Sequence, residues 1–498
     1  MTRSPRRLRT RRSSLRVKPA WRAWNPEQLF IALLLLIAFL PRLYVAVAWA
    51  REPVWDGHYY HFGAERIAEG FGYSEDVVVG GETVAKPWTH YPVGYSALLG
   101  LVYRVFGSGL LVAPLLNVAI GTLLALFAYL VARHYVSVAR ARAAGLLVAL
   151  HPGLITYTAL VMTELLAACT MLLAVWLALR DRQRWRGALA SGIAMGLAAL
   201  VRPTALLLAP LLAFPFSARS GMNGLKRTAL AGLAALAIIL PWTIRNCMVM
   251  DGCALISTNT GWNLAIGAVS DTGRFQTLRA SDGCSVVTGQ VQQDRCWWRV
   301  GVARIEADPV RWFGLMPAKL SHTFSHESFA TGYLRQADPE RWTAGRAERL
   351  RRALSTVHLL VLTFAALAVV GVPKPYSARL PGTWVQLLVG AGLVGYGGYA
   401  TFFTWEYPIH WLVVAMVALA VLPLPGRPRQ GAAGAVLIGL VAMTLLTHAV
   451  FFGEDRYHLV ITPVFCILAA AGLRRSAAVG SQPCPARGMS SRGIAAKE

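Results

Sequence analysis

An aspartate just beyond the first long apolar run is the first candidate for chemistry in this sequence. Asp56 lies in the segment WDGHYYHFGAERIAEGFGY, shortly after an apolar run over residues 29–48. If that run spans a membrane, the carboxylate is held at the level of the headgroups, where the phosphate ester of a lipid would lie. There it can act as a general base that deprotonates an attacking hydroxyl or amine. The alternative is a solvated loop carboxylate or a cap for the helix that follows.

Three arginines near the ends of other apolar runs carry the charge that complements this aspartate. They are Arg202 in LVRPTALLL, Arg245 in LPWTIRN and Arg456 in GEDRYHLVITP. A guanidinium fork stabilises the negative charge that grows on a phosphate as its ester bond breaks. Each arginine alone also fits an interface anchor whose charged end reaches the headgroups. Three of them on one side of a membrane, opposite Asp56, favour a binding site for a lipid phosphate.

The roles of one glutamate and two histidines stay open on sequence alone. Glu164, in ALVMTELLAA, begins an apolar run on the same side as Asp56. It can orient an arginine or touch an acceptor molecule, or it can simply stabilise a helix N-terminus. His58 and His61 are of a type that binds divalent metals, but no clear third ligand or D-x-D pair accompanies them. We therefore expect them to pack against aromatic rings, and we assign no certain metal cofactor.

The composition of the chain places these residues in a membrane protein. Of 498 residues, 55% are hydrophobic and only 15% are charged, which is more apolar and less charged than a typical soluble protein. The formal net charge is +25, but nine of the basic residues crowd into the first 22 positions. Such a cluster before an apolar run indicates a cytoplasmic anchor beside anionic lipid, so we expect no nucleic-acid partner.

The length of the apolar runs predicts the fold class. Runs that are long enough, or nearly long enough, to cross a membrane as helices cover residues 29–48, 108–132, 143–159, 162–180, 187–201, 203–218, 228–246, 355–372, 384–404, 409–424, 433–452 and 459–473. The sequence therefore predicts an all-α, polytopic membrane protein with about 12 transmembrane helices. The apolar piece from Val93 to Phe106 is shorter and suits an interfacial helix.

The short basic connections predict the orientation of the chain. With a cytoplasmic N-terminus they all fall inside, as the positive-inside rule requires. They are residues 133–142, 180–186, 219–227, 374–379, 427–429 and the tail from 474. The prediction divides the chain into a basic cytoplasmic tail (1–28), a membrane domain (29–473) and a disordered cytoplasmic tail (474–498). Two long segments then face outside, residues 49–107 and 247–354.

Four of the seven cysteines fall within or beside the second outer segment, namely Cys247, Cys253, Cys284 and Cys296. If this segment lies in an oxidising periplasm, one or two disulfides can form among them, and unpaired thiols are the equal alternative. The chain has no CxxC pair, so the cysteines do not indicate a zinc or redox motif.

Several of these segments, in their order along the chain, resemble the bacterial GT-C membrane glycosyltransferases. The likeness rests on Asp56 after the first run, YPVGY, TELLAA, LVRPTALLL, LPWTIRN with LISTNTGWNLAIG, and GEDRYHLVITPV. It covers most of residues 25–473 and is nearest in kind to the protein O-mannosyltransferases and the aminoarabinose transferases of lipid A, a glycosyltransferase family 39-like pattern. One departure is Gly57, where many relatives have glutamate, so Asp56 is the sole candidate base in this loop.

The resemblance implies an inverting transfer of a sugar from a polyprenyl-phosphate donor to a glycan, lipid or protein acceptor. Asp56 matches the family's first-loop catalytic carboxylate, and Arg202, Arg245 and Arg456 match its contacts with the donor phosphate. Glu164 is the second candidate for a catalytic role. The expected location is a bacterial inner membrane, with the active site on the periplasmic or extracellular side.

Two other classes of protein compete with an enzyme. A polytopic transporter or lipid flippase also combines many spans with charged residues at membrane depth. A non-catalytic scaffold that only holds a polyprenyl lipid is the third possibility. The charges cluster at the outer ends of the runs and the sequence shows no inverted repeat, which favours the enzyme over the transporter.

Overall fold

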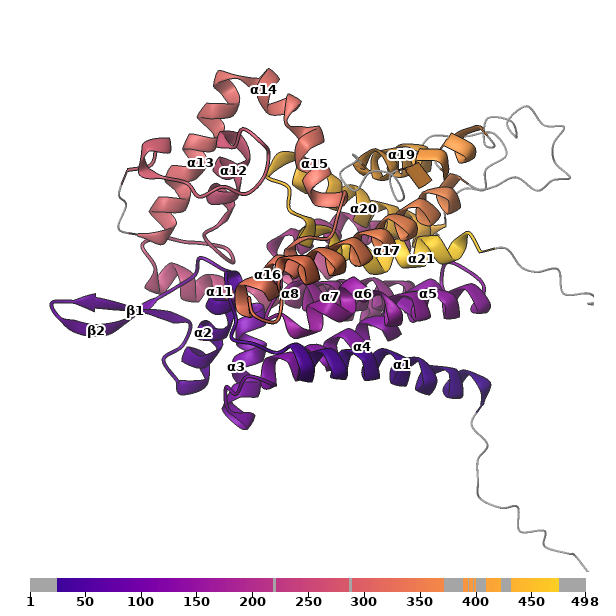
Figure 1. The fold of residues 1–498 in the computed structure, drawn as a ribbon, viewed down its shortest axis with the longest axis horizontal. Coiled ribbons are helices and arrows are strands. Elements are labelled where there is room, and N and C mark those ends of the chain that lie inside the picture. The colour runs from indigo at the N-terminus through magenta and orange to yellow at the C-terminus, as the bar shows by residue number, and fades with distance from the viewer. Residues whose placement is uncertain are drawn as a thin grey trace, which may run out of the picture.

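The computed structural model describes residues 25–217, 221–285, 289–370, 388–399 apart from 393 and 397, 409–421 and 431–473. These residues form a bundle of long helices with a smaller region at one end (Figure 1). Along the bundle, each of the following helices packs against the next: α1 (Pro26–Trp49), α4 (Val112–Ala132), α5 (Val138–Leu150), α21 (Thr462–Ala471) and α17 (Ala344–Val370). The bundle also contains α7 (Glu164–Arg180), α8 (Trp185–Val201), α11 (Gly221–Val249), α19 (His410–Val421) and α20 (Ala432–Val450).

Five of the described helices are long and apolar enough to cross a membrane, namely α1, α4, α11, α17 and α20. A sixth span results if α5 and the segment Pro152–Ala159, which is bent from it by 46°, are counted as one. That segment contains α6 (Pro152–Thr156) and η1 (Tyr157–Ala159). The protein is thus a multi-pass, mainly helical membrane protein, as predicted, but the predicted count of about 12 spans is not confirmed.

The difference in count has local causes. The apolar run over residues 203–218 is divided into η2 (Pro203–Leu207), α9 (Leu208–Leu211) and α10 (Ala213–Ser217). Each piece contains a proline, which removes a backbone donor and clashes with the preceding helical turn. Helices α8 and α19 are apolar but shorter than a full span. The run predicted over 384–404 lies partly outside the described residues.

One end of the bundle gathers basic connections that the sequence places inside the cell. Glu27, in the first turn of α1, pairs with Arg133 and lies 3.7 Å from Arg142. Arg140 donates a hydrogen bond of 2.7 Å to the carbonyl oxygen of Leu473. The start of α1 and the end of α21 therefore lie at the same end of the bundle (Figure 1).

The opposite end carries the smaller region, which is built from both segments predicted to face outside. Its elements are α2 (Asp56–Glu69), β1 (Ser74–Val79), β2 (Glu82–Pro87), α3 (Gly94–Phe106), α12 (Thr260–Val269), η3 (Ala280–Asp282), α13 (Gln290–Ala307), α14 (Pro309–Gly314), α15 (Met316–Phe324) and α16 (Phe329–Ala337). The two strands form an antiparallel hairpin with Ser74 opposite Pro87. The hairpin and α12 to α14 project from the bundle on the left and at the top of Figure 1.

Two disulfides stabilise this region. The structure pairs Cys247 with Cys253 and Cys284 with Cys296, so all four cysteines left open by the sequence are bonded. The first disulfide links α11 to the chain that follows it, and the second joins the segment before α13 to α13 itself. The second bond lies in a small buried cluster of its own, where a cross-link adds stability that a larger hydrophobic core would otherwise supply.

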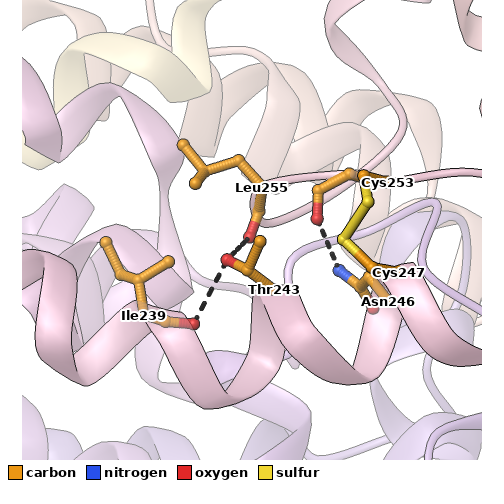
Figure 2. The surroundings of a disulfide bond; sticks show 7 residues. Ile239, Thr243, Asn246, Cys247, Cys253 and Leu255 are labelled. Atoms are coloured by element: carbon orange, nitrogen blue, oxygen red, sulfur yellow. Dashed lines mark hydrogen bonds between the residues drawn. A yellow bond between two sulfur atoms is a disulfide. The ribbon is translucent and has the colours of Figure 1, made fainter.

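The chain after the first disulfide runs back along the end of α11 (Figure 2). Asn246 Nδ2 donates to the carbonyl oxygen of Ala254 over 3.1 Å, and Thr243 Oγ1 donates to that of Leu255 over 2.7 Å. These bonds satisfy carbonyl groups that no regular element pairs. They fix the segment that leads into α12, which forms one wall of a cavity beside Asp56.

A buried arginine holds the break between α5 and α6. Arg42 is 0% exposed and donates to the carbonyl oxygens of Val148 (3.0 Å) and Ala149 (2.7 Å) at the end of α5. Helix-terminal carbonyls of this kind have no partner within the helix, and Pro152 offers no N–H to continue it. The bent segment then carries the chain to Glu164 at the start of α7.

Candidate active site

Asp56 is the first residue of α2 and follows a strained turn. The preceding Trp55 has φ 52°, in the left-handed region that bulky side chains rarely adopt. Its ring packs against Phe329 and Tyr333, with centroid separations of 5.4 and 5.9 Å. The aromatic contacts hold the turn, and the turn places the Asp56 carboxylate at the N-terminus of a helix, where negative charge is stabilised.

Both oxygens of the Asp56 carboxylate have partners from other parts of the chain. Tyr91 Oη donates to Oδ1 over 2.8 Å, and Arg456 Nη1 donates to Oδ2 over 2.5 Å. The arginine lies 400 residues further along the chain. The fold therefore joins the segment 49–107 to the start of the last helical segment at this carboxylate.

Arg456 is held from several sides. It lies at the start of η5 (Asp455–Ile461), and its Nε is 2.5 Å from Glu454 Oε2. The guanidinium carbon lies 4.7 Å from the ring centre of Phe329 and 5.1 Å from that of Tyr457. Carboxylates at the edge and aromatic faces above a guanidinium both stabilise its charge. Arg456 is thus a fixed cation.

The electrostatics of this group keep Asp56 ionised. Burial opposes ionisation, but the charge of Arg456 and the hydrogen bonds from Arg456 and Tyr91 together hold the pKa of Asp56 below its usual value. Burial raises the pKa of the Tyr91 hydroxyl, which therefore stays protonated and donates. Burial also lowers the pKa of the neighbouring His90 to about 4, so its ring is neutral at neutral pH. At Glu454, burial raises the pKa of the carboxyl.

A second ion pair lies beside the first. Arg202 Nη2 donates to Glu164 Oε1 over 2.9 Å, and Glu164 is 0% exposed. The guanidinium of Arg202 lies 5.2 Å from the ring centre of Tyr457, so Tyr457 contacts both Arg202 and Arg456. The second oxygen of Glu164 is buried and has no hydrogen-bond partner among the described residues.

These side chains surround a cavity of about 480 Å³, a size that suits a small ligand or one end of a larger one. Asp56, Tyr91, Arg202, Arg456, His448 and Trp262 are among the residues that line it. One wall thus comes from the ends of bundle helices and the other from α12 in the smaller region. A carboxylate, two guanidinium groups and aromatic rings face one space, which can bind a phosphate ester beside a polar acceptor.

The structure brings together four of the five site residues predicted from the sequence. Asp56, Arg202 and Arg456 line the cavity. Glu164 lies behind Arg202 and forms an ion pair with it. Arg245 lies apart from them and is outside the cavity lining.

The guanidinium of Arg245 binds the backbone of the segment that carries the hairpin. It donates to the carbonyl oxygens of Tyr73 (2.7 Å) and Trp88 (3.0 Å), at the two ends of the β1–β2 hairpin. It also lies 4.7 Å from the ring centre of Trp242. These contacts anchor the hairpin to α11 and leave no free fork for a phosphate.

The two histidines near Asp56 are engaged with aromatic residues, as the sequence suggested. His61 Nδ1 lies 2.7 Å from Tyr103 Oη, and His58 stacks on Phe62 with ring centres 6.4 Å apart. Within the described part of the chain, a different group can hold a metal ion, formed by Glu327, His358 and His458.

Sequence reasoning missed several residues of the site. Tyr91, His90, Glu454 and Tyr457 all contact or neighbour Asp56 or Arg456. A signal was present, because Tyr91 lies in YPVGY and Glu454 and Tyr457 lie in GEDRYHLVITP. Trp262 lies in a segment too far from Asp56 in sequence for any spacing to connect them.

Fold and site together define a class: a multi-pass helical membrane protein with an ion-paired, partly aromatic cavity at one end of its bundle. Residues 90–244 match a family model described as dolichyl-phosphate-mannose-protein mannosyltransferase. This segment contains Tyr91, Glu164 and Arg202. The resemblance to GT-C membrane glycosyltransferases predicted from the motifs is confirmed by this match. Among curated proteins, none matches the chain.

Solved structures of membrane glycosyltransferases are similar to the chain at low identity. One is an oligosaccharyltransferase of Archaeoglobus fulgidus tethered with an acceptor peptide that contains the NVT sequon, with 15% identity, a TM-score of 0.45, and coverage of 90% of this chain and 49% of that chain. Another is AglB of the same organism in complex with an inhibitory peptide and a dolichol-phosphate, with 14% identity, a TM-score of 0.44, and coverage of 90% and 50%. A third is ArnT of Cupriavidus metallidurans bound to undecaprenyl phosphate, with 17% identity, a TM-score of 0.33, and coverage of 89% and 76%. The chain spans about half the length of the archaeal proteins.

Proposed function

We propose that this protein is a membrane glycosyltransferase that moves a sugar from a polyprenyl-phosphate donor to an acceptor at the outer face of the membrane. The observation that carries the proposal is the contact between Asp56 and Arg456 in one cavity. A base and a phosphate-binding cation at this distance are the two groups that displacement of a sugar from a lipid phosphate needs.

The proposed reaction is a single displacement. The acceptor hydroxyl or amine attacks the anomeric carbon, a new bond forms from that carbon to the acceptor, and the carbon–oxygen bond to the phosphate breaks. The bonding electrons leave with the polyprenyl phosphate, whose growing charge is stabilised by Arg456 and Arg202. The acceptor proton passes to Asp56. Attack on the face opposite the phosphate inverts the anomeric configuration.

The ion pair between Asp56 and Arg456 suits this order of events. Without donor, Arg456 compensates the buried charge of Asp56, and an ion-paired carboxylate is a weak base. A donor phosphate offers the guanidinium of Arg456 a second anion, which takes up part of its positive charge and adds negative charge beside the carboxylate. The pKa of Asp56 then rises toward that of a useful base, because burial is left as the main influence on it. Donor binding thus prepares the base.

Arg202 and Glu164 have supporting roles in the proposal. Arg202 lines the cavity and is the second cation available to the phosphate. Glu164 is fully buried, lies behind Arg202 and fixes its guanidinium over 2.9 Å. Glu164 is therefore a positioning residue for Arg202. The proposal omits Arg245 from the donor site because its guanidinium already binds two backbone carbonyls.

Two observations support a location of the site at the outer face, in a bacterial inner membrane. Asp56 and Trp262 line the cavity and belong to α2 and α12, which lie at the end of the bundle opposite the contacts of Arg133, Arg140 and Arg142 (Figure 1). Basic connections favour the cytoplasmic side. The region around the cavity contains both disulfides, which persist in oxidising compartments such as the periplasm.

The donor class is the part of the proposal that an experiment can test first. The purified protein in lipid nanodiscs is incubated with radiolabelled polyprenyl-phosphate monosaccharides, hexoses and pentoses, and separately with the matching nucleotide sugars. Membranes from a strain that lacks the gene provide the acceptor. We expect transfer of label and release of polyprenyl phosphate with a lipid donor only, and dependence on the acceptor membranes.

The same preparation distinguishes the enzyme from a flippase. In proteoliposomes, a flippase moves the intact sugar lipid across the bilayer and leaves the bond between sugar and phosphate unbroken. Translocation without release of polyprenyl phosphate, for every donor in the panel, would refute the glycosyltransferase. Mass spectrometry of the glycans and lipids lost in the deletion strain then identifies the sugar and the acceptor.

A further inference from the structure

Three buried side chains that the proposed reaction does not use come together beside the segment that carries Arg456. Glu327 lies between α15 and α16, His358 lies in α17, and His458 lies in η5. They are 3%, 1% and 0% exposed. The three residues come from separate elements, and no spacing in the sequence connects them.

The backbone fixes the tautomer of each histidine. His458 Nδ1 lies 2.6 Å from the carbonyl oxygen of Thr323, and His358 Nε2 lies 2.8 Å from that of Phe324. A carbonyl oxygen only accepts, so each of these nitrogens carries its hydrogen and donates. In the neutral rings, His458 Nε2 and His358 Nδ1 are left as lone-pair acceptors. Histidines that bind metals show this arrangement, in which the second nitrogen donates to a carbonyl and orients the ring.

The remaining acceptors converge. His458 Nε2 lies 3.2 Å from Glu327 Oε1, and one donor atom from each of the three residues lies within 4.8 Å of the others. The rings of His358 and His458 are stacked with centres 4.0 Å apart. Two imidazole nitrogens and a carboxylate oxygen that face one another repel unless a proton or a cation lies between them.

We infer that Glu327, His358 and His458 form a binding site for a divalent cation of the zinc class. Neutral imidazole and carboxylate are ligands that zinc prefers, at bond lengths of about 2.0–2.2 Å. Tetrahedral bonds of this length place ligand atoms roughly 3.4 Å apart. The separation between His458 Nε2 and Glu327 Oε1 already agrees. The ligand atom of His358 lies within 4.8 Å of both and has to move closer to complete the set.

A neighbouring glycine provides space beside the site. A Cβ at Gly153 would lie 2.9 Å from Glu327 Oε1 and 3.3 Å from His151 Nδ1. Because Gly153 has no side chain, Glu327 and His151 can both lie close to its backbone. His151 is buried, and its Nε2 has no hydrogen-bond partner among the described residues. A water bound to the cation as fourth ligand would find a polar neighbour there.

The cation would fix the segment that carries Arg456. His458 follows Arg456 by two positions, and Glu327 precedes Ser328 and Phe329, whose N–H groups donate to Asp455 Oδ2. Phe329 in turn packs on the guanidinium of Arg456. The ion thus ties α17 and the segment between α15 and α16 to η5. This role is structural, and it goes beyond the proposed function without depending on it.

Metal content of the purified protein tests the inference without any assay of activity. The protein is prepared without a histidine tag, loaded with Zn²⁺, dialysed and analysed by mass spectrometry for metals. We expect about one equivalent of zinc. Glu327→Gln, His358→Gln and His458→Gln should each weaken zinc binding by at least about 10–100-fold, the loss that follows even from changing an outer partner of a ligand. His410→Gln, at another buried histidine, is the matched control and should retain the zinc.

A second measurement on the unaltered protein guards against variants that fail to fold. A chelator should lower the thermal midpoint, and added Zn²⁺ should restore it. Burial raises the pKa of Glu327 to about 8, so the alternative without metal is a protonated carboxyl that donates to His458. Less than about one tenth of an equivalent of zinc after loading, together with a midpoint unchanged by the chelator, would establish that alternative and overturn the site.

Discussion

Replacement of Arg456 tests how the structure prepares both the donor site and the base. Its guanidinium lies 2.5 Å from Asp56 and 2.5 Å from Glu454 and packs on two aromatic rings. Loss of a preorganised group that stabilises charge in the transition state costs about 2.7–4 kcal/mol, or about 10²–10³ in rate. We expect Arg456→Ala to lower kcat/KM for the sugar lipid by this factor.

Arg456→Lys separates charge from geometry. Lysine keeps the positive charge but loses the planar fork that can hold a carboxylate and a phosphate together. Loss of one charge-assisted hydrogen bond costs about 1.5–3 kcal/mol, so a decrease of at least about tenfold is expected, smaller than that of the alanine variant. The assay is transfer from a labelled polyprenyl-phosphate sugar at saturating acceptor. Arg304→Ala, at an exposed arginine of the outer region, is the control.

The pH dependence gives the same variants a second readout. The active form of Asp56 is the carboxylate, so its contribution to kcat/KM is lost as the pH falls through its pKa. Arg456 holds that pKa below the usual 3.8. In the plot of kcat/KM against pH, the decline on the acidic side should therefore occur at low pH for the wild type. Arg456→Ala removes the positive charge that most strongly opposes the effect of burial on the pKa of Asp56. The acidic decline of kcat/KM should therefore move to higher pH in this variant, and by a smaller amount in Arg456→Lys. An alanine variant with unchanged kcat/KM and an unshifted acidic decline would show that Arg456 is only an interface anchor.

Three further predictions concern the frame around the site. Arg245→Ala should lower the free energy of unfolding by about 1.5–3 kcal/mol in a thermal unfolding experiment, because the contacts with two hairpin carbonyls are lost. It should leave KM for the donor unchanged in kinetic measurements, and a raised KM would return Arg245 to the donor site. Replacement of both Cys284 and Cys296 by serine should cost about 3 kcal/mol, and alkylation followed by mass spectrometry should find these thiols blocked until the native protein is reduced; free thiols would contradict an oxidising compartment. Reporter fusions at Gly80 and Gly283 should both report an outer location, and a cytoplasmic signal from either would refute the topology.

Much of the candidate site was predictable because the ends of apolar runs can be assigned to one side of the membrane. This assignment places charged residues that are distant in sequence on the same side. Asp56 and Arg456 are 400 residues apart, yet both follow from the placement of charged groups at the outer ends of apolar runs. Arg245 satisfied the same criterion and lies elsewhere. Its partners are the carbonyl oxygens of Tyr73 and Trp88, and sequence patterns contain no signal for contacts made by backbone groups.

The helix count was less predictable for a physical reason. Apolar composition alone does not separate a continuous span from short helices that are interrupted by proline, as the division of residues 203–218 shows. The cluster of Glu327, His358 and His458 was not predictable either. Its members belong to three elements, and only the packing of α17 against its neighbours brings them together.

The central claim is that Asp56 removes the acceptor proton, and Asp56→Asn tests it most directly. Asparagine preserves the size of the side chain but cannot take up the proton. With wild type and variants matched for expression and thermal stability, transfer from a labelled polyprenyl-phosphate sugar should fall by about 10²–10⁴-fold, while the sugar lipid still binds. Glu75→Gln, at a carboxylate of the hairpin that accepts a hydrogen bond from Gln290 over 3.3 Å, should stay near wild-type activity. Near-normal turnover of the Asp56→Asn protein would contradict the account and would move the search for the base to Glu164.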